Sequence, residues 1–65
     1  MNLGNSLKIA LTKAGKNQSQ LAEDLGITRQ SVNRWAVSGN MTKETIEMLS
    51  GYFGMKPSEF VALGE

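Results

Sequence analysis

The sequence predicts an all-α fold: one compact domain, residues 1–65, built from five short helices. Its apolar residues recur at intervals of three and four, which places them on one side of a helix, and no long run alternates apolar with polar residues. Glycines at positions 15, 26, 39, 51, 54 and 64 divide the chain into segments of helix length. Because a chain this short buries only about 60% of its unfolded surface, a partner chain would add useful buried area.

The first two helices are predicted from their end signals. Residues 3–14 carry their leucines on one stripe, and Gly15 provides the helix stop. Asn17 is a good N-cap for the next helix, and Gln20, three residues later, can complete a capping box. Gly26 ends this second helix.

The other three helices begin at residues that favour helix starts. Thr28 is the expected N-cap of a helix that continues to about Val37. Thr42 caps a fourth helix, whose apolar residues repeat at helical spacing up to Gly54. Pro57, a favoured first helical residue, begins the fifth. We expect residues 42–63 to complete the core and to supply a dimer contact.

The composition argues against several classes of function. The chain has no cysteine and no histidine, which removes disulfides, thiolate chemistry and zinc ligation by either residue. We therefore expect no enzyme, no cofactor and no metal site, and we interpret the neighbours Glu23 and Asp24 as a solvated acidic surface. No apolar run approaches the roughly 18 residues of a membrane span, and the start does not resemble a signal peptide. A cytoplasmic location without membrane contact is expected.

The function of the chain is indicated by the stretch from Gln18 to Asn40, QSQLAEDLGITRQSVNRWAVSGN. Two short helices joined by a Gly-Ile-Thr turn, about residues 17–37, have the helix-turn-helix shape. At about 100° per residue, one side of the second of these helices collects two arginines, two carboxamides and a valine: Arg29, Gln30, Asn33, Arg34 and Val37. Arginine and carboxamide side chains can form paired hydrogen bonds with guanine and adenine edges in the major groove of DNA. A polar helix face is also often merely solvated, but the preceding helix and turn favour DNA reading.

These residues resemble the helix-turn-helix regulators of the phage Cro and lambda-repressor superfamily, and Cro proteins especially. The resemblance is carried by Gln18, Leu21-Ala22, Leu25-Gly26-Ile27, Thr28, Val32, Asn33-Arg34 and Gly39. It implies that Arg29, Gln30 and Asn33 read bases and that Arg34 is shared between bases and backbone. It also implies that Gln18 and Thr28 contact phosphates, with Asn40 and then Lys43 as weaker phosphate candidates. Some Cro proteins end in a sheet, but the helix-start residues Thr42 and Pro57 favour an all-helical chain here.

Val37 and Trp35, in the third helix, each have two possible interpretations. Many relatives have a charged residue soon after the tryptophan and fewer residues before the loop glycine, whereas this chain has Ala36, Val37 and Ser38 there. Val37 is interpreted either as a contact for a thymine methyl group or as a packing residue. Trp35 falls on the inward side, which favours core packing over stacking on a base.

The expected function is sequence-specific binding of double-stranded DNA by a homodimeric repressor at a palindromic operator, with no small-molecule ligand. Half-sites about 34 Å apart suit a two-fold dimer. The expected interface is formed by Met55, Phe60 and Val61; in the alternative interpretation Phe60 closes the core with Leu63, which leaves Val61 as the better candidate. The competing function is a protein-interaction module of the same fold, such as an antitoxin-like or anti-repressor domain. Steep loss of affinity with salt would favour DNA.

Overall fold

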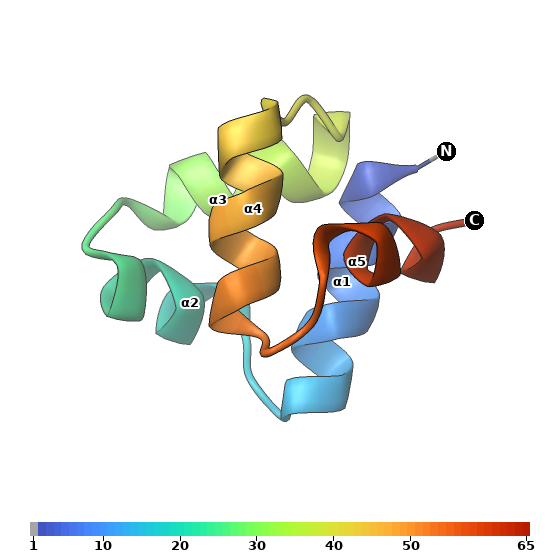
Figure 1. Ribbon diagram of the computed structural model, residues 1–65. Coiled ribbons are helices and arrows are strands. Elements are labelled where there is room, and N and C mark those ends of the chain that lie inside the picture. The colour runs from blue at the N-terminus through green and yellow to red at the C-terminus, as the bar shows by residue number, and fades with distance from the viewer. Residues whose placement is uncertain (1) are drawn as a thin grey trace.

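A computed structural model describes residues 2–65 and shows an all-α fold (Figure 1). Within these residues the chain forms five α-helices and no strand: α1 (Leu3–Ala14), α2 (Gln18–Leu25), α3 (Arg29–Ser38), α4 (Lys43–Tyr52) and α5 (Pro57–Leu63). The predicted fold class is confirmed, and the expected all-helical C-terminal part is present. The third helix ends one residue later than expected. Among residues 2–65, no helix combines the length and apolar character needed to cross a membrane.

The ends of the helices follow the residues predicted to set them. At the start of α2, the Asn17 side chain accepts a hydrogen bond from the Gln20 N–H at 2.8 Å, and the Asn17 N–H donates to the Gln20 side chain at 2.9 Å. The Thr28 and Thr42 side chains cap α3 and α4 in the same way, each accepting from a backbone N–H three residues later at 3.2 Å. Each cap satisfies a helix-start donor that would otherwise lack a partner.

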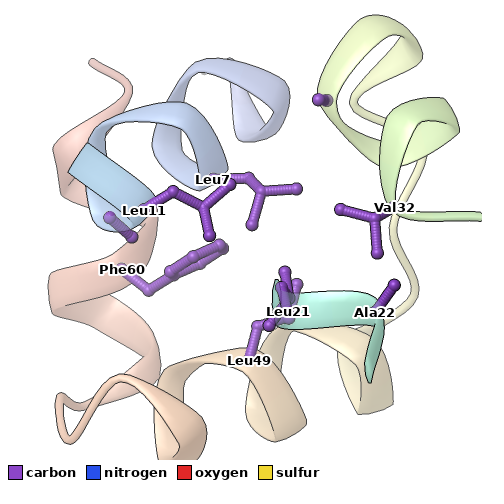
Figure 2. Packing of buried hydrophobic residues seen from close by; sticks show 9 residues of the cluster. Leu7, Leu11, Leu21, Ala22, Val32, Leu49 and Phe60 are labelled. Carbon is purple, nitrogen blue, oxygen red and sulfur yellow. The ribbon is translucent and has the colours of Figure 1, made fainter. Parts of the chain in front are cut away.

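One apolar core receives side chains from every helix (Figure 2). Its fully or almost fully buried members are Leu7, Ala10, Leu11, Leu21, Ala22, Val32, Ala36, Leu49 and Phe60. Packing among these side chains holds the inner side of α3 against α1 and α2, so the outer side of α3 has a defined position. Burial of this kind supplies the main favourable contribution to folding.

Phe60 lies in the core and not on the surface, which corrects its assignment to a dimer interface and agrees with the alternative interpretation, in which it closes the core. Its side chain has no solvent-exposed area. Its ring stacks on that of Phe53, with 6.4 Å between the ring centroids, and thereby joins α5 to the end of α4. A side chain without exposed surface offers nothing to a partner unless the fold opens.

The start of α1 approaches α3 and the end of α5 so closely that glycine is required at two positions, Gly4 in α1 and Gly64 after α5. A Cβ atom built on Gly4 would lie 3.1 Å from the carbonyl carbon of Ala36 and closer still to the carbonyl oxygen. A Cβ atom on Gly64 would lie 2.9 Å from the Ser6 nitrogen. The Ser6 hydroxyl also donates to the Val61 carbonyl at 3.2 Å. These contacts hold the start of α1 against α3 on one side and against α5 on the other.

A polar cluster of Lys16, Asp24 and Tyr52 joins the α1–α2 turn, the end of α2 and the end of α4. The Lys16 Nζ atom lies 3.1 Å from Asp24 Oδ2 and 5.2 Å from the centroid of the Tyr52 ring, and the Tyr52 hydroxyl donates to the same carboxylate oxygen. The Tyr52 hydrogen bond and then the Lys16 ammonium lower the pKa of Asp24. Asp24 is exposed, as expected of a solvated acidic surface, and is in addition a bonded member of this cluster.

Candidate nucleic-acid interface

The α2–turn–α3 unit is held by short-range hydrogen bonds. Gly26 adopts a left-handed conformation (φ 70°), which glycine tolerates without steric cost, and this conformation ends α2. The Ile27 N–H donates to the Ala22 carbonyl at 3.0 Å, after which Thr28 begins α3. Ala22 and Val32, which are almost or fully buried, allow the two helices to pack closely. The turn and this packing give α3 a fixed direction relative to α2.

The third helix has one buried side and one exposed side. Val32 and Ala36 face the core, and Trp35, which is half-buried, packs against it in agreement with its predicted inward position. The opposite side carries four exposed polar residues: Arg29, Gln30, Asn33 and Arg34. Within residues 2–65, none of these four side chains forms a hydrogen bond or an ion pair, and α3 contains no acidic residue. Their hydrogen-bonding groups are therefore free to bind a ligand.

Three of these side chains lie around one surface depression. Arg29, Gln30 and Asn33 line a hollow of about 290 Å³ on the first two turns of α3. It holds one cationic fork and two carboxamides, and so presents both donors and acceptors. This combination matches the hydrogen-bonding edges of purine bases. The structure thus brings together three of the residues expected to read bases.

The residues expected to contact phosphates lie at the beginnings of helices or in the adjoining loop. Gln18 is the first residue of α2 and is half-buried, whereas Thr28, at the N-cap of α3, is exposed. The Thr28 hydroxyl oxygen accepts from the Ser31 N–H at 3.2 Å. Helix beginnings suit phosphate groups because unpaired N–H groups and the helix dipole face the anion.

The loop after α3 holds the two remaining candidates. Asn40 is exposed in this loop, and its backbone N–H donates to the Ser38 hydroxyl at 3.2 Å. Lys43 is exposed at the first position of α4. Both side chains can reach solvent, as a phosphate contact requires.

The sequence left open whether Val37 packs within the protein or is available to DNA. Its side chain is 74% exposed, so the packing interpretation is wrong. Phase on the helix already placed it beside Asn33 and Gln30, but phase alone did not show whether another segment would cover it. The outward side of α3 therefore contains an apolar group among its polar ones.

Comparison with known proteins supports the structural description. A protein-family model described as helix-turn-helix, of the Cro/C1 type, matches residues 7–60. The match begins within α1 and ends within α5, so it includes α2, the turn and α3 in full. No curated protein and no solved structure gave a significant match to the chain.

Proposed function

The chain belongs to the Cro/C1-type helix-turn-helix family, and on that premise we propose that it is a homodimeric transcriptional repressor that binds a palindromic DNA operator. This family consists of DNA-binding regulators, which makes double-stranded DNA the partner of the α2–turn–α3 unit. Within the family, we propose that this chain is most similar in action to Cro repressors. The proposed place of action is the cytoplasm, where the operator DNA of a phage or of its bacterial host lies.

The observation that carries the proposal is the free polar side of α3. A helix of this kind fits the major groove of B-DNA, where each base pair shows a distinct pattern of donors and acceptors. Arg29, Gln30 and Asn33 would read base edges from the hollow that they line. Arg34, one turn further along, would be shared between a base edge and the backbone. Each well-placed paired contact contributes about 1–3 kcal/mol of discrimination between bases.

Phosphate contacts would position this helix without reading sequence. Gln18 at the start of α2 and Thr28 at the start of α3 are the principal candidates, and Asn40 and Lys43 are secondary ones. Contacts on both sides of the groove fix the register of a recognition helix. They also make binding sensitive to salt, because bound phosphates release counterions.

A dimer would place two copies of α3 in successive major grooves on one side of the DNA, about 34 Å apart. Met55 and Val61, both half-buried, remain the interface candidates near and within α5, whereas Phe60 is enclosed in the core. A partner that covered Met55 and Val61 would complete their burial. Repression would follow by occlusion, since a dimer bound across a promoter blocks polymerase.

The test is selection from random double-stranded DNA with the full chain at near-physiological salt. We expect enrichment of a two-fold palindrome whose binding weakens steeply as salt rises. The Arg29→Ala variant should bind more weakly and enrich a palindrome whose preference is relaxed at one base position, whereas Lys8→Ala, which removes an exposed cation from α1 instead, should keep the wild-type preference at every position. The variants must show the same helical content as the wild type.

The other outcomes are equally informative. Enrichment of a single, non-palindromic half-site would contradict the dimer but keep DNA reading. Folded protein that enriches no sequence would contradict the proposed function and favour a protein-interaction module. If the bound protein increased transcription from a promoter fragment in a purified system, that result would contradict repression.

A further inference from the structure

Val37 is the more exposed of two large apolar side chains that stand out on the surface of residues 2–65. Its exposed fraction is 74%, against 43% for Met48 on α4. Nothing in helix stability explains a valine at this position. A β-branched residue forms helices less readily than alanine because its side chain loses rotamer freedom there. This exposed valine is therefore available for a contact outside the chain, and its place on α3 decides which contact that can be.

The position of Val37 on α3 specifies what it can contact. With about 100° of rotation per residue, Val37 lies about 40° around the helix from Asn33 and about 20° from Gln30. It therefore stands between the polar residues of the outward side and not at its margin. Along the helix axis it lies about 6 Å beyond Asn33, because each residue adds about 1.5 Å. A surface that met Asn33 and Arg34 would also meet Val37.

We propose that Val37 is a specificity-determining residue that contacts the C5-methyl group of a thymine. The inference rests on the proposed function, because it requires α3 to lie in the major groove. The thymine methyl is the apolar group that base pairs present there, and a valine side chain has no donor or acceptor for any other base feature. About 6 Å corresponds to roughly two base steps of 3.4 Å, so the thymine should lie within about two base pairs of the base that Asn33 reads.

The chemistry of this contact differs from that of its polar neighbours. A hydrogen-bonding residue discriminates because a wrong base leaves a buried donor or acceptor without a partner. Val37 would discriminate because the correct base removes apolar surface from water. The contact should therefore depend on one methyl group and should be almost insensitive to salt, in contrast to the phosphate contacts.

The test removes the methyl group alone. In the operator obtained by selection, each thymine is replaced in turn by deoxyuridine, which keeps the base pair and lacks only the C5-methyl group. For the wild type, we expect one such replacement in each half-site to weaken binding about fourfold, the change expected for one buried methyl group. The Val37→Ala variant should bind the thymine and deoxyuridine operators equally. Met48→Ala, the matched loss of an exposed apolar side chain elsewhere, should keep the wild-type difference.

The outcomes separate this inference from the proposed function. An operator with no methyl-sensitive position, or with the same sensitivity in Val37→Ala, would overturn the role of Val37 and leave DNA reading intact. Selection that enriches no sequence would overturn both. Because Val37 is mostly exposed, its truncation should leave the thermal midpoint of the protein nearly unchanged, and this is checked first.

Discussion

Replacing Gly4 by alanine tests whether the packed position of α3 depends on the close approach of α1. An added Cβ atom would lie 3.1 Å from the Ala36 carbonyl carbon and 3.2 Å from the Trp35 carbonyl oxygen. It would lie closer still to the Ala36 carbonyl oxygen, so the two backbones would have to separate. Both contacts are on α3, whose position the proposed DNA reading requires.

The expected change in the free energy of unfolding follows from two opposing effects. Insertion of a methyl group where backbone atoms leave no room costs about 1–3 kcal/mol. Alanine in place of glycine within a helix returns up to about 1 kcal/mol. An added Cβ atom on Gly51, in α4, would have no atom of another segment within 4 Å, so Gly51→Ala gains the helix contribution without the clash. We therefore expect Gly4→Ala to be less stable than Gly51→Ala by about 1–3 kcal/mol.

Thermal unfolding followed by circular dichroism measures this difference. The two variants are compared at one protein concentration, because dimer formation would make the midpoint depend on concentration. For a domain of this size, each kcal/mol shifts the midpoint by about 4–8 °C. A Gly4→Ala midpoint equal to or above that of Gly51→Ala would show that the α1–α3 approach is not tight and would refute the reasoning.

Three further predictions concern DNA reading, the polar cluster and the core. Arg29→Ala should weaken operator binding by about 1–3 kcal/mol and relax one base preference, whereas Gln18→Ala should weaken operator and random DNA alike in fluorescence anisotropy titrations; equal relative losses for Arg29→Ala would contradict base reading. The pKa of Asp24 lies below its ordinary value of 3.8, so its stabilising contribution is present above pH 3.8 and is lost as pH falls through the lower folded-state value. In acid titrations below pH 3.8, the wild type should therefore lose stability more steeply than Asp24→Asn, and parallel curves would count against the cluster. Phe60→Ala should destabilise the fold by about 3–5 kcal/mol at every protein concentration, and a loss confined to high concentrations would return Phe60 to the dimer interface.

Features that depend on residues a few positions apart were predictable from the sequence. Asn17 and Gln20 form the predicted capping box, and Thr28 and Thr42 cap the helices that they were expected to begin. These signals involve residues three apart, so a short stretch of sequence contains the whole interaction. The inward and outward sides of α3 were predictable for the same reason, because helix geometry alone sets the angle between residues.

The features that the sequence did not predict all depend on a second segment of the chain. The sequence left Phe60 between a dimer interface and the core, and the packing of α4 and α1 against α5 decides its complete burial. Asp24 is exposed as expected, but its hydrogen bond from Tyr52, 28 residues away, could not be predicted from local sequence. Helical phase and local spacing contain no information on such distant partners.

By itself, the sequence determined the helical class, the helix ends and the polar side of α3, because capping and helical periodicity act within a few residues. The tertiary structure decided which apolar residues are enclosed and which remain free. It enclosed Phe60, left Val37 in solvent, and required glycine at position 4 where α1 meets α3. These outcomes depend on how closely whole helices approach, and close packing around a single core is a property of the assembled fold.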